Sequence, residues 1–165
     1  MKKIIVSLLL LLPLCLTAQE LKIAYVNYHE IFTTLPDYTV VEDELAKMNQ
    51  QYQQEAKTME DRFNRMYADY MAQADSLAEN IRVLRMQEIQ DLQNRLENFV
   101  PMAQEEMQKK QQTLLAPIQD KVQKAINSVG EENGYTYIIN PQAFFYMGNN
   151  AVNVTDKVKT KLGIK

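Results

Sequence analysis

Strand-forming sequence occurs at both ends of this chain, and helix-forming sequence separates the two ends. Residues 21–27, LKIAYVN, have the alternation and the β-branched and aromatic side chains of a strand, and similar sequence returns at residues 135–140 and 143–147. A lone hairpin is marginal in water, whereas three strands that share a core form a more plausible body. Because the first strand must reach the other two, the segment 38–133 has to return to the place where it began. The sequence therefore predicts a helical hairpin inserted into a small sheet body.

The apolar residues of the first arm recur at steps of three and four residues. They are Val41, Leu45, Met48, Tyr52, Ala56, Met59, Phe63, Met66 and Tyr70. This spacing predicts an amphipathic helix with one apolar stripe, the pattern of a coiled-coil partner. A second stripe runs from Leu77 to Val129 with irregular steps, so we expect the supercoil to loosen locally.

The stretch AQADSLAEN, residues 72–80, interrupts the stripes with small and polar side chains. Ser76 and Glu79 match the S-x-x-E capping box, which marks a helix start and favours a reversal here. The alternative is one helix that runs straight through, because Ala, Leu and Glu all tolerate it. The need for the terminal strands to meet favours the reversal. We therefore expect a hairpin of residues 38–133 that reverses near residues 73–80.

Two prolines lie inside the second stripe. Pro101 and Pro117 each lack a backbone N–H and clash with the preceding turn, at a cost of roughly 3 kcal/mol in a helix interior. Each should kink the arm or end a helical segment, so both are candidate hinges. Asp37 is well placed to cap the first arm, and Gly134 to end the second in the left-handed conformation. A final short helix is expected to begin at Thr155 and to reach Leu162.

The first twenty residues have the pattern of a secretory signal peptide. Lys2 and Lys3 precede an apolar run of thirteen residues, 4–16, which is shorter than the roughly 20 residues that a membrane-spanning helix needs. Cleavage after Ala18 is expected to remove residues 1–18. One alternative is an uncleaved membrane anchor, which the short apolar run disfavours. The other is lipid modification of Cys15, which the neighbouring Leu14 disfavours. Cys15 is the only cysteine, so cleavage would leave neither a disulfide nor a thiol nucleophile.

Charge and motif content exclude several function classes. After cleavage the chain would hold 16 basic and 21 acidic side chains, which argues against a nucleic-acid partner because phosphates need a basic surface. Residues 38–133 alone hold 11 basic and 17 acidic side chains. The single histidine, His29, stands without a cysteine nearby, and we find no metal-ligand spacing and no glycine-rich phosphate loop. We therefore expect no cofactor and no enzymatic activity.

Several stretches carry a resemblance to a known family. They are IAYVN at residues 23–27, the long Gln-rich hairpin, residues 114–140 (LLAPIQDKVQKAINSVGEENGYTYIIN) and residues 154–163 (VTDKVKTKLG). With the signal peptide, they resemble the Skp/OmpH family of periplasmic chaperones. The resemblance implies an α+β, mostly α fold and a homotrimer, whose body of residues 19–37 and 134–165 forms a shared barrel with three prongs around a cavity. It also implies ATP-independent holding of unfolded outer-membrane β-barrel proteins. Because this prong is acidic, contacts with lipopolysaccharide or membrane lipid are not carried over.

Some apolar residues of the arms fall off the two stripes or at their margins. They are Tyr67, Met71, Val83, Met86, Val100, Met102 and Leu115. Flexible thioether and aromatic side chains re-pack around different partners, so this set is our candidate client-binding surface. The other interpretation is that single apolar side chains are normal on a surface and that Tyr67 and Met71 only widen the stripe.

The strand residues also allow two interpretations. Ile23, Tyr25, Ile138, Phe144 and Tyr146 could pack one subunit's body, or they could form the trimer contacts. The small size of the body favours a core shared between subunits. An alternative function is a structural or adaptor coiled coil of the cell envelope that docks one fixed partner. Such an adaptor should show a regular outer stripe, whereas the outer apolar residues here are scattered.

Overall fold

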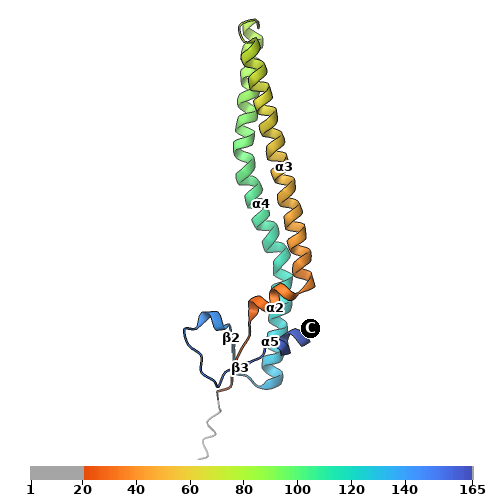
Figure 1. Ribbon diagram of the computed structural model, residues 1–165, viewed down its shortest axis with the longest axis vertical. Coiled ribbons are helices and arrows are strands. Elements are labelled where there is room, and N and C mark those ends of the chain that lie inside the picture. The colour runs from red at the N-terminus through yellow and green to blue at the C-terminus, as the bar shows by residue number, and fades with distance from the viewer. Residues whose placement is uncertain (1–20, 165) are drawn as a thin grey trace, which may run out of the picture.

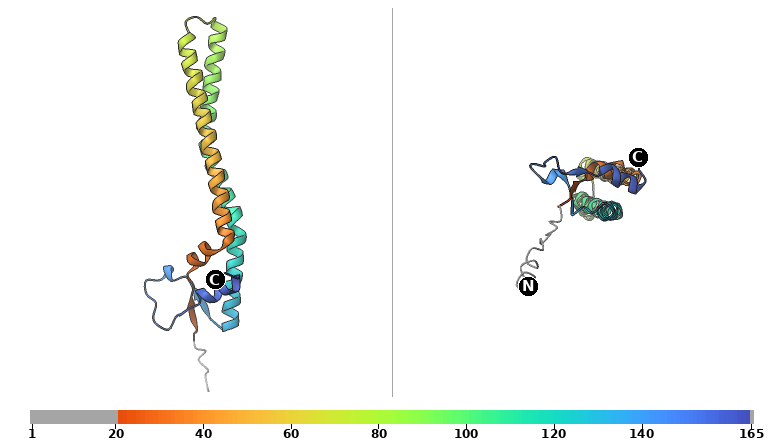
Figure 2. Two further views of the ribbon diagram at one scale, coloured as in Figure 1. Left: turned by 45° about the vertical axis from the view of Figure 1, so that its right-hand side comes forward. Right: turned by 90° about the horizontal axis from the view of Figure 1, so that it is seen from below.

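The computed structural model describes residues 21–164, so the expected signal peptide lies outside the described residues. The elements in chain order are β1 (Ile23–Tyr25), α2 (Tyr28–Thr34), α3 (Pro36–Gln73), α4 (Glu79–Asn133), β2 (Tyr137–Ile139), the 3-10 helix η2 (Pro141–Ala143), β3 (Val152–Asn153) and α5 (Thr155–Leu162). Helices α3 and α4 lie side by side and extend far beyond the small sheet (Figures 1 and 2). We call this helix pair the prong, and the remaining elements with the base of α4 the body. The expected mostly helical α+β fold with a small sheet is confirmed.

The sheet of the body has the order β2-β1-β3, and both neighbours run parallel to β1. The strand predicted at residues 143–147 is wrong. Pro141 begins η2 instead, with the Asn140 side chain accepting a hydrogen bond from the Gln142 N–H at 3.2 Å. The chain then crosses to the other edge of β1 before it forms β3. A parallel third strand requires such a crossover, because a tight turn joins only antiparallel neighbours.

The core of the body lies between β1, α2, α5 and the base of α4. Its fully buried side chains include Ile31, Leu35, Val122, Val154 and Val158. Each such side chain contributes about 1.5–3 kcal/mol relative to full exposure. The one buried polar residue in the described range is Thr155, whose Oγ1 accepts a hydrogen bond from the Asn27 N–H at 3.0 Å. This bond joins the residue before α2 to the first residue of α5.

The helix ends differ from their expected caps in two places. No side chain caps α4 at its start, so the capping box of Ser76 and Glu79 is wrong. The Ser76 hydroxyl instead donates to the Gln73 carbonyl at 2.8 Å, at the point where α3 ends and the chain reverses. Asp37 does not cap α3 either: Leu35 occupies the cap position, and the Asp37 carboxylate lies 2.7 Å from the Lys121 ammonium on α4. Gly134 ends α4 with φ 64°, as predicted.

Helix α4 continues through both of its prolines. Neither Pro101 nor Pro117 ends a helical segment, and both lie on the exposed side of α4. The carbonyls that lose their donor belong to Glu97 and Thr113, which are also exposed, so water can satisfy them. A proline in this position weakens a long helix without breaking it. No helix in residues 21–164 combines the length and the apolar character of a membrane span.

Candidate functional site

The tip half of the prong, residues 58–108, carries most of the exposed apolar side chains of the two long helices. Six of the seven residues singled out above are exposed there, with between 42% and 60% of their surface accessible. They are Tyr67, Met71, Val83, Met86, Val100 and Met102. Leu115 is different, because it is partly buried and packs against the core of the body. Leu115 therefore lies apart from the exposed surface of the tip half.

The structure adds two residues of the second apolar stripe to the exposed set, although their place in the stripe predicted a contact with α3. Ile81 and Leu84 are exposed, whereas Ile89 and Leu92 on the same helix are buried against α3. The step from Leu84 to Ile89 is five residues, which turns the helix about 140° beyond a full turn. Because Ile89 points toward α3, Leu84 points away from it. The irregular step in the sequence was the available signal for this exposure.

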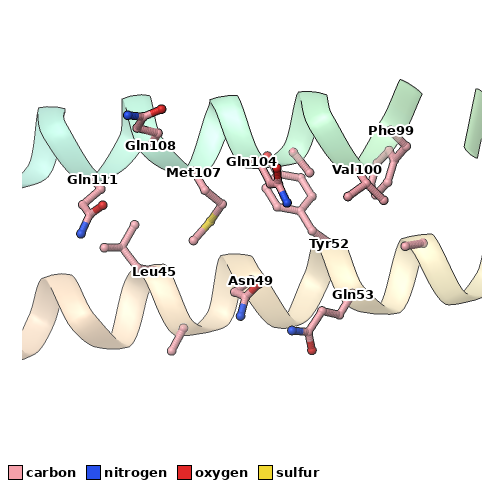
Figure 3. A pocket seen from close by; sticks show the side chains of 13 residues that line it. Leu45, Asn49, Tyr52, Gln53, Phe99, Val100, Gln104, Met107, Gln108 and Gln111 are labelled. Carbon is pink, nitrogen blue, oxygen red and sulfur yellow. The ribbon is translucent and has the colours of Figure 1, made fainter. Parts of the chain in front are cut away.

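Between the arms lies a groove of about 720 Å³. From α3 it is lined by Leu45, Ala46, Asn49, Tyr52, Gln53 and Ala56, and from α4 by Phe99, Val100, Ala103, Gln104, Met107, Gln108 and Gln111. Figure 3 shows the Tyr52 side chain reaching across from α3 and Met107 pointing into the space between the helices. The lining contains apolar side chains and amides but no charged residue. Such a lining can bury apolar side chains and hydrogen-bond a polypeptide backbone at the same time.

Tyr52 bridges the arms at this groove. Its hydroxyl donates to the Glu106 carboxylate, and its ring meets Phe99 edge to face with centroids 5.9 Å apart. The hydrogen bond to Glu106 raises the pKa of Tyr52 above its ordinary value of 10.0. The hydrogen bond and the ring contact together join α3 to α4 at the groove.

Among residues 21–164, the ion pairs that link the arms lie toward the body. Lys110 pairs with Glu44 at 2.8 Å, and Lys121 pairs with Asp37 at 2.7 Å. Within the described chain, the ion pairs closer to the tip, such as Arg85 with Glu88, join residues of one helix. The tip half is consequently held together by its narrow apolar contact, which leaves its outer side chains accessible.

The body exposes a second apolar surface. Tyr137 is 58% exposed and pairs in register with Ile23, so both side chains lie on the sheet face opposite the core, together with Tyr25. Ile138 lies on the other face, where its Cδ1 would be 3.4 Å from a Cβ on Gly130 of α4. This position fits the interpretation in which Ile138 packs the body of one subunit. Alternation along the strand explains both positions.

The segment between η2 and β3 extends this surface away from the helices (Figure 1). It exposes Phe144, Phe145 and Tyr146, and Phe145 has no cover at all from the described residues. Sequence reasoning included Phe144 and Tyr146 but missed Phe145 and Tyr137. It expected a strand here, and alternation would have turned Phe145 inward.

The described residues contain no group of three or more side chains suited to bind a metal ion. His29 is exposed at the start of α2. The accessible features of this structure are thus apolar surfaces and an amide-lined groove on an elongated helical scaffold. They define a long helical hairpin on a small sheet body that exposes apolar side chains.

The comparisons with known proteins agree with this class. The family model described as "Outer membrane protein (OmpH-like)" matches residues 22–162, and the chain belongs to this family. Its fold is similar to the crystal structure of a candidate outer membrane chaperone (OmpH-like) from Caulobacter crescentus CB15, with a TM-score of 0.74 and 14% sequence identity. The match covers 86% of this chain and 83% of that one. Comparison with curated protein sequences gives no match.

Proposed function

We propose that this protein is an ATP-independent holdase of the periplasm, which binds unfolded outer-membrane β-barrel proteins and prevents their aggregation. The observation that carries the proposal is the set of eight large apolar side chains exposed on the tip half of the prong. Single exposed apolar residues are ordinary, but eight on one slender helix pair exceed what stability requires. Membership of the OmpH-like family and the fold of the Caulobacter protein support the same function.

The chemistry of the surface suits partners without fixed shape. Methionine and tyrosine adapt to irregular apolar surfaces, and the amides of Asn49, Gln53 and Gln104 in the groove can both donate and accept hydrogen bonds. An unfolded β-barrel protein offers alternating apolar side chains and an unpaired backbone. The groove and the exposed side chains can satisfy both requirements without reading one particular sequence.

The proposed assembly is a homotrimer. Its support is the outer sheet face with Tyr137, Ile23 and Tyr25, and the adjoining aromatic residues Phe144 to Tyr146. So many aromatic side chains on a small body mark an interaction surface. Three such bodies that share their sheets would cover the aromatic side chains and hold three prongs around one cavity.

The proposed function is tested by whether the protein binds several unrelated unfolded clients. The protein is mixed with several unrelated outer-membrane barrel proteins, each unfolded in urea, and light scattering and complex mass are measured after dilution. A holdase keeps several of them soluble in complexes of defined stoichiometry. If one fixed partner or none is held, the holdase proposal fails, and binding of one partner would favour the adaptor alternative.

A further inference from the structure

The chain places its two kinds of cationic side chain in separate regions. All five arginines lie in the tip half, at positions 62, 65, 82, 85 and 95, and no lysine occurs between Lys57 and Lys109. Arg62 and Arg65 stand on α3 and the other three on α4, so both arms contribute. Lysine and arginine form helices about equally well, so the helix itself does not dictate this choice. The separation points to a property of the guanidinium group.

Net charge does not explain the arginines. The tip half holds ten carboxylates against five guanidinium groups, so it does not attract an anionic surface. Arg82 and Arg85 pair with Glu79 and Glu88 on the same helix, and these exposed pairs are worth little and exchange readily. Among the ion pairs of the described chain, none includes Arg62, Arg65 or Arg95. Their guanidinium groups are available to a partner.

Four of the five arginines border hollows whose linings include apolar side chains. Arg62, Arg85 and Arg95 line one hollow of about 430 Å³ together with Met66 and Leu92 and with the carboxylates of Glu88 and Asp91. Arg82 lines a more apolar hollow of about 460 Å³ with Tyr70, Val83 and Met86, and Gln87, Gln90 and Asp91 complete its lining. A planar guanidinium beside an apolar wall suits an aromatic ring, which stacks against the cation and buries its edge on the methionine or leucine. The compact, strongly hydrated ammonium of lysine has no such plane.

Building on the proposed function, we infer that the tip half selects unfolded segments by their aromatic side chains, through stacking on its arginines. Outer-membrane barrels carry girdles of aromatic residues at both membrane interfaces, so their unfolded chains present such rings repeatedly. The arginines then give the chaperone a preference that apolar contact alone would not provide. Met66 and Met86 supply the apolar part of the same contact.

The test replaces all five arginines by lysine, which keeps both charge and helix propensity. The probes are two soluble extended peptides of equal length and charge, one with Tyr and Phe and the other with Leu at the same positions. The wild-type protein should bind the aromatic peptide more tightly. In the lysine variant this preference should fall by roughly fivefold, the scale of one exposed cation–π contact.

Three controls make the result specific. Changing Lys57, Lys109 and Lys124 to Arg adds guanidinium groups outside the tip half and should leave the preference unchanged. Circular dichroism checks that the helices are retained. If five changes disturb them, the double variant Arg62→Lys with Arg95→Lys, which alters no ion pair, is measured instead.

The outcomes separate this inference from the proposed function. If the wild-type protein binds the unfolded barrels but the lysine variant keeps the full aromatic preference, the arginine inference is overturned and the holdase proposal stands. If the wild-type protein binds neither the barrels nor the peptides, both fail. In a third outcome, the wild-type protein and the lysine variant bind phosphatidylglycerol vesicles equally well, and neither prefers one peptide. This would show that the arginines act through surface charge, and it would also overturn the inference.

Discussion

Leu84 and Leu92 are the same residue type on the same helix, about two turns apart, yet they lie in opposite environments. Leu92 is 8% exposed against α3, whereas Leu84 is 51% exposed. Leu92→Ala should lower the free energy of unfolding by about 2–3 kcal/mol, because it leaves a cavity between the arms. Leu84→Ala should change it by less than about 0.5 kcal/mol. Urea unfolding of both variants checks this, and equal losses would contradict the assignment of the two faces.

The exposed residues of the tip half allow stability and binding to be separated. Replacing Tyr67, Met71 and Met86 together by Gln removes apolar surface but keeps good helix-forming side chains. We expect aggregation of an unfolded barrel client to be suppressed several-fold less well, with unchanged helicity and unchanged mass of the assembly. Light scattering during client dilution measures the effect. If the triple variant suppresses client aggregation as well as the wild-type protein does, these residues do not form the client-binding surface.

At the scale of elements, Pro101 and Pro117 are expected to make helix α4 easier to bend. Each removes one hydrogen bond on the exposed side of a helix that otherwise continues without a break. Replacing both by Ala should raise the free energy of unfolding by roughly 1–3 kcal/mol and slow amide exchange around both positions.

Stiffer prongs should also accept a narrower range of clients, measured with unfolded barrels of different size. A variant that is stabilised but keeps the full range would show that bending at the prolines does not serve binding.

The sequence predicted most elements, because long periodic helices and their Gly134 terminator follow from local chemistry. It failed where tertiary context decides. The crossover that places Val152–Asn153 beside β1 depends on which edge of β1 is free, and no periodicity records that. The inward side of Ile138 depends on register with Ala24. The exposure of Leu84 follows from where α3 lies, although the five-residue step was visible.

At the scale of the whole molecule, the outer sheet face predicts self-association. Tyr137→Asp places a charge on that face and should shift the proposed trimer toward monomer at micromolar concentration, because a buried unpaired charge is costly. The fold of one subunit should be retained, since Tyr137 does not belong to its core. Asn127→Asp, on the exposed side of α4 at the body, is the matched control and should remain trimeric. If sedimentation shows that the wild-type protein is a monomer, the proposed trimer is contradicted.

The most direct test of the central claim is site-specific photocrosslinking to an unfolded client. Benzoylphenylalanine is placed at Met71 and Met86 in the tip half, and at Asn127 on the body as a control, and each protein is irradiated with a urea-diluted outer-membrane barrel protein. Client adducts are expected at Met71 and Met86, with few at Asn127. Adducts concentrated at Asn127, with none at the two methionines, would contradict the claim that the tip half of the prong holds clients.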